Sequence, residues 1–409
     1  MMGGSVGEST GTRSPNTDRG QRRILVLTTT LPAVPGDGTP EFVLSLAREM
    51  STDYDITILA PRVRGAPISQ QFGRLRVVRF PYFPRRWEGL ADGAILPNLR
   101  AARWRLIEVP FLLAAMMVCS FIHALREKPA LVHAHWIVPG GLVAMLVKAV
   151  TGTKYILTVH GSDVYGLRGA AYVFLRDRIV AAASAVLPVS HHLATSLQLA
   201  PDACTVIPMG VDRRDLPARI AHERYATSNL LFIGRLAEQK GVDVLLRALA
   251  RVADVHLTVV GEGPERSSLE ALALRLDVAE RVAFLGHQRR EGVIRLLADA
   301  SVLVIPSRAS AHGDREGTPV VLAEGIAMGG PIIASSIGGL AERIDHGVTG
   351  LLVEPGNVND LAEALECAVR DPEGMLRFAE KARATLLPGL DMRTTASRYV
   401  EVVRGIVCR

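Results

Sequence analysis

Aromatic residues, paired cysteines and targeting signals are scarce in this chain of 409 residues. Only 5% of the residues are aromatic, which argues against a base-stacking surface, and we expect no nucleic-acid partner. The four cysteines lack CxxC spacing and indicate neither a zinc site nor a disulfide framework. A reducing compartment suits this pattern, so we expect a cytoplasmic protein.

From the sequence we expect neither a secretory signal nor a membrane span. Residues 1–21 are polar, without an apolar core, and predict a disordered tail. The apolar stretch at 109–125 has 17 residues, the short limit for crossing a bilayer. Because Pro110 and His123 lie at its ends and a strand-like segment follows, we expect a buried core or interdomain helix there, with a span as the alternative.

Positive charge is in moderate excess, with a net charge of +6 and a pI near 9.3. Arginines gather between Arg62 and Arg105. One interpretation is an ordinary solvated surface. The other is a face that attracts an anionic substrate or contacts an anionic membrane peripherally, which would place the protein at the inner face of the plasma membrane.

Short apolar runs alternate with helical patterns over most of the chain, which predicts the α/β class with parallel sheets buried on both faces. The alternation stops at a polar stretch and then restarts, so we expect two Rossmann-like doubly wound domains that face each other across a cleft. The predicted parts are a tail at 1–21, an N-terminal acceptor-side domain at 22–211, a linker at 212–228, a C-terminal nucleotide-sugar domain at 229–390, and a helix at 391–409 that crosses back to the N-terminal domain.

The stretch at 301–329 carries the clearest chemical signal. Thr318 and Pro319 have the residue types of a helix N-cap and of the first helical position. The unpaired N–H groups and positive dipole end of such a helix suit a diphosphate. Glu324, about one and a half turns into the helix, suits two ribose hydroxyls. Glu316 lies in the preceding loop, where a sugar on the β-phosphate would project.

Three sequence strings resemble motifs of a known family. They are VIPMGVD, GRLAEQKGVD, and PSRASAHGDREGTPVVLAEGIAMGGP with its Glu316-x7-Glu324 spacing. Over roughly residues 23–366 the chain resembles the retaining GT-B glycosyltransferases of family 4, or group 1, and among them members that build polysaccharides. The resemblance implies the GT-B fold and metal-independent transfer of a sugar from a nucleoside diphosphate sugar to a hydroxyl of a glycan or lipid-linked acceptor.

The resemblance also assigns residues. Arg235 and Lys240 are expected to contact the donor diphosphate, where fixed cations would stabilise the departing group. His160 is expected to contact the donor sugar, and Glu316 to steady it. The remaining donor-binding assignments are Gly36, Gly38, Gly261, Gly263, Gly317, Thr318, Pro319 and Glu324. The family often has a Gly-Gly pair where this chain reads Gly36-Asp37-Gly38, so which amide faces the donor stays open.

His135 and Asp163 are assigned to the acceptor side. His133 and His135 alternate on one strand, and together with His160 they form a candidate metal set. No carboxylate or cysteine completes a recognised spacing, so we predict no metal, and we expect no cofactor.

Other functions fit parts of the pattern. A GT-B-like nucleotide-sugar 2-epimerase shares the two halves and the sugar nucleotide, and a binding protein that has lost activity would share the donor site. An NAD-dependent oxidoreductase is disfavoured because GEGPER, at 261–266, lacks the third glycine of the dinucleotide fingerprint. The residue types leave the nucleotide, the sugar and the acceptor open.

Overall fold

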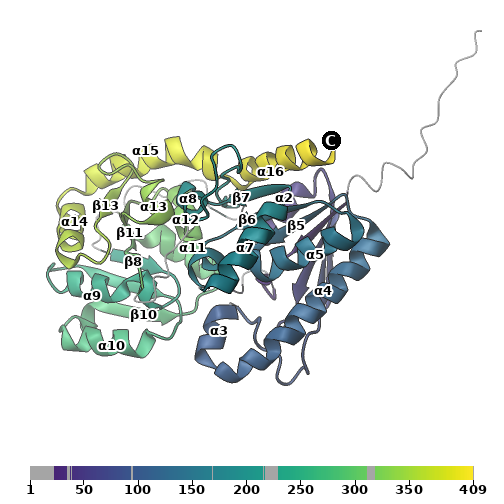
Figure 1. The fold of residues 1–409 in the computed structure, drawn as a ribbon. Coiled ribbons are helices and arrows are strands. Elements are labelled where there is room, and N and C mark those ends of the chain that lie inside the picture. Colours follow the sequence, from purple (N-terminus) through teal and green to yellow (C-terminus); the bar gives the residue numbers. More distant parts are fainter. Residues whose placement is uncertain are drawn as a thin grey trace, which may run out of the picture.

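The computed structural model describes residues 23–34, 37, 39–93, 95–167, 169–214, 216, 229–310 and 318–408. They form two α/β halves side by side, each a largely parallel sheet between helices (Figure 1). The predicted α/β class with two Rossmann-like sheets is confirmed. The tail at 1–21 and most of the linker at 212–228 lie outside the described residues.

The N-terminal sheet has the strand order β3-β4-β2-β1-β5-β6-β7. Without the antiparallel edge strand β3, this is the Rossmann order, and all its other pairs are parallel. The strands are β1 (Arg23–Leu27), β2 (Asp55–Pro61), β3 (Ser69–Phe72), β4 (Leu75–Phe80), β5 (Leu131–His135), β6 (Tyr155–Val159) and β7 (Ala185–Pro188). Central strands such as YILTV in β6 are buried at every position, as expected of a sheet covered on both faces.

The helices of this half connect the strands and cover the sheet. They are α2 (Phe42–Met50), α3 (Ile95–Ala101), η1 (Arg103–Ile107), α4 (Glu108–Glu127), η2 (Trp136–Gly141), α5 (Leu142–Thr151), α6 (Ser162–Tyr165), α7 (Ala170–Ala182) and α8 (His191–Ser196).

The C-terminal sheet, β10-β9-β8-β11-β12-β13, has the Rossmann order with every pair parallel. Its strands are β8 (Asn229–Ile233), β9 (His256–Val260), β10 (Val282–Gly286), β11 (Val302–Ile305), β12 (Ile332–Ser335) and β13 (Leu351–Val353). Its helices are η4 (Glu238–Lys240), α9 (Val242–Leu249), α10 (Arg266–Arg275), η5 (Ala279–Arg281), α11 (Arg290–Asp299), α12 (Val320–Met328), α13 (Gly338–Ala341), α14 (Val358–Arg370) and α15 (Pro372–Leu390).

The last helix, α16 (Met392–Val407), leaves the C-terminal half and packs on α2 of the N-terminal half (Figure 1). The two chain crossings between the halves are hydrogen-bonded to each other. Val211 N donates to Leu390 O at 2.7 Å, and Met392 N donates to Val211 O at 3.0 Å. Gly210 allows this approach, since a Cβ there would lie 2.7 Å from the Met392 Cα. The two crossings therefore form one joint between the halves.

The apolar stretch at 109–125 lies in α4, and the expectation of a buried helix was wrong. One stripe of α4 packs against the sheet, and it includes Leu112 and Met116. The opposite side is exposed, with Phe111 at 51% and Leu125 at 61%. By length and composition, Arg103–Glu127 is the one stretch of the described chain apolar enough to cross a membrane. Because apolar residues lie all round the helix, the sequence carries no period that would reveal which side is covered.

Candidate active site

A cavity of about 560 Å³ lies between the two halves, at the carboxyl ends of their parallel strands. Doubly wound sheets bind ligands at these ends, and the volume lies within the usual range for ligand pockets. The N-terminal half contributes Thr39, Pro40, Glu41, Phe42 and Ser45, and the joint contributes Gly210, Val211, Asp212 and Met392. The other lining residues come from the C-terminal half and include Arg235, Lys240, Gly261, Arg290, Thr318, Pro319 and Glu324.

Two cations line the cavity beside the end of β8. Arg235 follows this strand, and Lys240 ends the short helix η4. Leu236 N donates to Glu262 O at 3.0 Å, which fastens the Arg235 turn to the turn after β9. Burial and the nearby Arg100 guanidinium lower the pKa of Arg235. This end of the cavity is electropositive, and a bound anion would be stabilised there.

Gly261 and Gly263 allow the turn after β9 to approach the turn that carries Arg235. A Cβ on Gly261 would lie 1.9 Å from Gly234 O, and its φ of +133° also requires glycine. A Cβ on Gly263 would lie 2.1 Å from Leu236 O. Gly261 lines the cavity, whereas Gly263 is absent from the lining. The second glycine therefore acts in packing the two turns together.

The start of α12 lies at the cavity, but its cap differs from the prediction. The helix begins at Val320, and Pro319 occupies the N-cap with φ −68° and ψ 136°. Proline fixes φ and leaves ψ free, so Pro319 stays extended and Thr318 falls one residue outside the cap. The Thr318 hydroxyl is buried and has no hydrogen-bond partner among the described residues. Both residues line the cavity, and the helix N-terminus opens into it.

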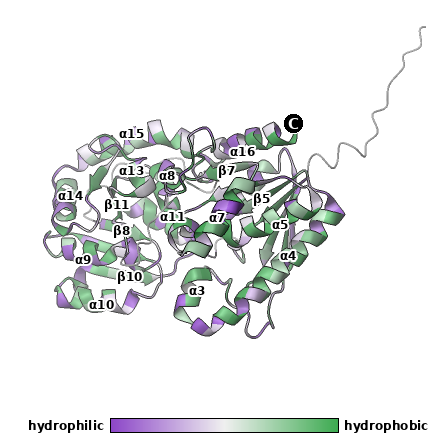
Figure 2. Ribbon diagram, in the orientation of Figure 1, coloured by the Kyte–Doolittle hydropathy of each residue, from purple (hydrophilic) through white to green (hydrophobic). Residues whose placement is uncertain are grey.

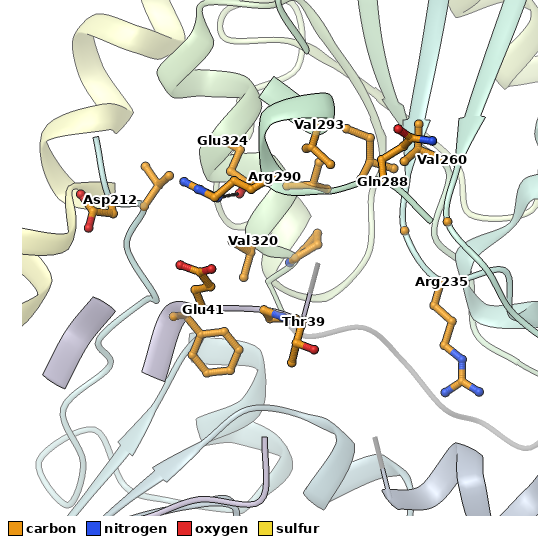
Figure 3. Close-up of a pocket in the computed structure, with 18 of the residues that line it drawn as sticks. Thr39, Glu41, Asp212, Arg235, Val260, Gln288, Arg290, Val293, Val320 and Glu324 are labelled. Carbon is orange, nitrogen blue, oxygen red and sulfur yellow. Dashed lines mark hydrogen bonds and ion pairs between the residues drawn. The ribbon is translucent and has the colours of Figure 1, made fainter. Parts of the chain in front are cut away.

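Glu324, on α12, is held by Arg290 from the start of α11. Arg290 Nη1 lies 3.0 Å from Glu324 Oε1, and the two side chains are 20% and 14% exposed. Figure 3 shows this pair across the cavity from Arg235, with Glu41 and Asp212 beside it. Burial raises the pKa of Glu324, the Arg290 charge opposes the rise, and Glu41 adds to it. Arg290 therefore fixes the orientation of the Glu324 carboxylate at one end of the cavity.

His160, at the end of β6, lies behind the cavity wall. Its ring is 4.9 Å from the ring of Phe42, which lines the cavity, and 4.6 Å from that of Trp136. His160 Nε2 lies 3.0 Å from His135 Nδ1. Burial, with a contribution from His133, lowers the pKa of His160 to about 3. At neutral pH it is thus an uncharged hydrogen-bonding group.

Comparison with known proteins decides the family. A profile for group 1 glycosyl transferases matches residues 222–385, and one for a glycosyl transferase 4-like domain matches residues 37–210. The chain belongs to the group 1 glycosyltransferases. It is 29% identical to the glycogen synthase of Mycobacterium tuberculosis over 291 residues, which are 67% of this chain and 68% of the relative.

Solved structures share the GT-B fold of this glycosyltransferase. Sucrose-phosphate synthase from Thermosynechococcus elongatus gives a TM-score of 0.78 at 19% identity, over 95% of this chain and 99% of the other. HepE of Anabaena in complex with UDP-glucose gives a TM-score of 0.72 at 18% identity, over 94% of this chain and 99% of the other. At these identities the likeness concerns the fold.

The two residues assigned to the acceptor side of the glycosyltransferase do not line its cavity. His135 is 1% exposed and contacts His160. Asp163 is 4% exposed, and its carboxylate accepts hydrogen bonds from Ile137 N at 3.1 Å and Gly161 N at 2.8 Å. Burial raises the pKa of Asp163 to about 6. Both side chains hold together the loops that follow β5 and β6.

Part of the predicted donor site falls outside the described residues, namely Gly36, Gly38, Glu316 and Gly317. Asp37, between the two glycines, is described. Its carboxylate accepts a hydrogen bond from Thr39 N at 2.8 Å, and its carbonyl oxygen lies 2.6 Å from His287 Nε2 of the other half. Among the residues that the structure describes, no group of three or more His, Cys, Asp and Glu is arranged to hold a metal.

Sequence reasoning missed Arg290, Glu41 and Asp212 of this glycosyltransferase. Arg290 and Glu41 lie in none of the strings that resemble the family motifs, and Asp212 ends one of them, VIPMGVD, but was assigned no role. Arg290 follows β10, Glu41 precedes α2, and Asp212 belongs to the joint, so only tertiary packing brings them to Glu324. The one available signal is their position after strand ends or at a crossing, which many surface residues share.

Proposed function

We propose that this glycosyltransferase moves a sugar from a nucleoside diphosphate sugar to a hydroxyl of a glycan or lipid-linked saccharide, with retention of anomeric configuration. We propose further that it acts in cell-surface polysaccharide synthesis, in the cytoplasm or at the inner face of the plasma membrane. One observation carries the donor part of this proposal. A single cavity is lined by the cations Arg235 and Lys240, by the N-terminus of α12, and by Glu324 across from Arg235. HepE, of the same fold, binds UDP-glucose.

The proposed pose follows from the charges. The diphosphate lies between Arg235, Lys240 and the start of α12, and the ribose hydroxyls donate to Glu324. Glu316 contacts the transferred sugar. The acceptor hydroxyl enters from the N-terminal half and attacks the anomeric carbon from the face of the leaving group. As the bond to the β-phosphate oxygen breaks, that phosphate takes the proton of the acceptor hydroxyl.

The joint between the halves supports the same proposal. It is a single pair of hydrogen-bonded crossings, so the two halves can close on the donor by bending there. Closure would exclude water, which competes with the acceptor for the activated sugar.

A screen of UDP-, GDP- and ADP-sugars by thermal shift and by hydrolysis tests the donor part. One nucleotide is expected to stabilise the protein, by about 2.7 kcal/mol at a hundredfold excess over Kd. Product analysis without acceptor separates the epimerase alternative, since an epimerised sugar nucleotide would support that enzyme instead. Stabilisation without turnover for any acceptor would support the inactive binding protein.

Replacing Arg290 with methionine tests the role of the Glu324 carboxylate. Loss of the Arg290 charge raises the pKa of Glu324 further, so the donor KM is expected to increase about tenfold or more. The protonated form of Glu324 accepts hydroxyl hydrogen bonds poorly, so the increase is greatest in acid and shrinks as the pH rises. The measurement is the donor KM as a function of pH, for the ribonucleotide donor and its 2′-deoxy analogue.

Arg62→Met is the matched control for this experiment. Arg62 is 22% exposed and pairs with the buried Glu88 at 2.5 Å, away from the cavity. It should lower thermal stability without changing how the donor KM depends on pH. The ratio of the KM for the 2′-deoxy donor to the KM for the ribonucleotide donor should decrease in Arg290→Met and stay unchanged in Arg62→Met. An unchanged KM across pH in that variant would show that the donor does not use Glu324.

A further inference from the structure

The outward side of α4 is apolar from Val109 to Leu125. From Val109 to Phe121 the helix has no charged residue, and Figure 2 shows α4 green over much of its course. Phe111, Val118 and Leu125 are 51%, 54% and 61% exposed. A surface helix of a globular protein normally turns polar residues outward. An uninterrupted exposed apolar stripe of this kind marks a surface that something covers.

The stripe continues past the start of α4 into η1 and the loop before α3. Trp104 and Ile107 of η1 are 50% and 60% exposed, and Trp87 is 49% exposed. The Phe83 ring connects the two parts, since its centroid lies 5.3 Å from that of Phe111. The apolar face, as named below, consists of Trp87, Trp104, Leu106, Ile107, Phe111, Val118, Ile122 and Leu125.

Exposed arginines lie at both ends of the apolar face. Arg85, Arg86 and Arg103 are exposed near its aromatic end, and Arg126 near the other end. The Arg86 guanidinium lies 4.0 Å from the centroid of the Trp87 ring. Tryptophan and arginine around an apolar strip suit the boundary between acyl chains and headgroups of a bilayer. The positive rim favours anionic headgroups over neutral ones.

The inner side of α4 shows that the helix lies on a surface and does not cross one. Its buried stripe packs on α5 and β2. The Glu108 carboxylate, fully buried at the start of the helix, accepts hydrogen bonds from Gly89 N at 3.2 Å and Leu90 N at 2.9 Å. Leaving the sheet to span a bilayer would expose this carboxylate and its partners to lipid. Only the outward side is therefore available.

The same segment reaches the donor cavity. Arg100, in the last turn of α3, is close enough to lower the pKa of Arg235 electrostatically. The chain from α3 through η1 to α4 thus connects the phosphate end of the cavity with the apolar face. A surface that covers the apolar face lies near the site where an acceptor must arrive.

We propose that the apolar face docks on an anionic lipid bilayer, with α4 lying in the plane of the interface and the arginines on headgroup phosphates. The docking proposal goes beyond the proposed function because it assigns the surface that contacts the membrane. It rests on the proposed function in one respect, that the bilayer supplies the acceptor. Flat insertion of such a helix depends on its buried apolar area and on attraction to anionic lipid.

Flotation of the full chain with vesicles tests the proposal. One vesicle contains phosphatidylcholine alone, and the other phosphatidylcholine and phosphatidylglycerol in equal parts. Wild type is expected to float with the anionic vesicles. The variant Val118→Ser, Ile122→Ser, Leu125→Ser should lower the bound-to-free ratio about tenfold or more. Replacing Arg85, Arg86 and Arg103 with glutamine should abolish the preference for anionic vesicles.

Leu274→Ser is the matched control, because Leu274 is 70% exposed on α10 of the other half. It should float like wild type. Wild type that stays unbound with both vesicles, or a triple serine variant that floats as well as wild type, overturns the proposal. A lipid-free dimer that the serine variant dissociates would overturn it in favour of a second copy on this face. Donor hydrolysis should be unchanged in the serine variant, so the failure of docking and that of the proposed transfer are separate results.

Discussion

Arg235→Ala is expected to lower kcat/KM for sugar transfer by about two to three orders of magnitude. When the bond to the anomeric carbon breaks, negative charge collects on the departing diphosphate. Arg235 is partly buried at the end of β8, and burial together with Arg100 lowers its pKa. The interaction of such a cation with the diphosphate is most favourable when the negative charge on the diphosphate is largest. That charge is larger in the transition state than in the bound donor.

The loss should therefore fall mainly on kcat, and lysine should rescue only part of it. Lysine restores the charge at position 235 but not the planar fork that contacts two phosphate oxygens. Lys240→Ala should have a similar effect of smaller size. The double variant should lose less than the product of the two single effects, because both cations serve one diphosphate.

Steady-state kinetics with the donor found in the screen gives the measurement, and Arg62→Met controls for the loss of a partly buried guanidinium. A thermal midpoint near that of wild type for Arg235→Ala shows that the fold survives. If that variant keeps a kcat within about twofold of wild type, the leaving diphosphate does not contact Arg235, and the pose proposed above is wrong.

Arg235 and Lys240 were assigned through the string GRLAEQKGVD, which resembles a family motif, and both line the cavity. Arg235 lies two residues past the end of β8, and in doubly wound sheets such positions face the ligand. The Arg290–Glu324 pair could not be predicted in this way. Its members are 34 residues apart and belong to different helices, so no spacing in the sequence relates them. The contact exists only because α11 and α12 pack beside each other.

Two further differences have similarly physical reasons. The composition of Thr318-Pro319 allows either residue to be the cap, and the ψ of Pro319, which the sequence does not fix, decides between them. The helix α4 is apolar on all sides, so hydropathy predicts its existence and not which side meets the sheet. In both cases the sequence predicts that a helix forms. The tertiary structure decides where α12 begins and which side of α4 faces the sheet.

The buried histidines of the N-terminal half should make it unfold in mild acid. His133 and His135 are each 1% exposed, and burial lowers the pKa of His133 to about 3 and that of His135 well below 6.5. An unfolded histidine titrates near pH 6.5. These groups therefore stabilise the fold fully above pH 6.5. Their contribution is lost as the pH falls, since the unfolded chain then takes up protons that the folded chain refuses.

The size follows from about 1.36 kcal/mol for each pH unit and each proton. By about pH 4.5, His133 and His160 each cost close to 3 kcal/mol, and His135, whose pKa is also lowered by burial, adds to the loss. Asp163 acts in the opposite direction. Its pKa is raised to about 6, so the folded state binds its proton first and gains roughly 2 kcal/mol by pH 4.5.

His133 and His160 together against Asp163 leave a net loss of about 3 kcal/mol at pH 4.5, to which His135 adds, and this is a large part of the whole stability of many domains. All three tryptophans, Trp87, Trp104 and Trp136, belong to the N-terminal half, so tryptophan fluorescence reports on this half alone. The measurement is chemical denaturation followed by this fluorescence between about pH 8 and pH 4.5. The denaturation midpoint is expected to fall steeply below about pH 6.5.

The variant His133→Gln distinguishes the effect of protonating His133 from the effect of its packing and hydrogen bonding. The glutamine amide can keep a hydrogen bond to Thr158 Oγ1, which His133 Nε2 makes at 2.8 Å, but it cannot take up a proton. The variant should lose some stability at neutral pH and show a slope in acid that is flatter by about 1.36 kcal/mol per pH unit. His256→Gln, at the exposed start of β9, is the control. A wild-type slope in His133→Gln would mean that the acid sensitivity arises elsewhere, and that the folded state admits a charged imidazole beside Thr158.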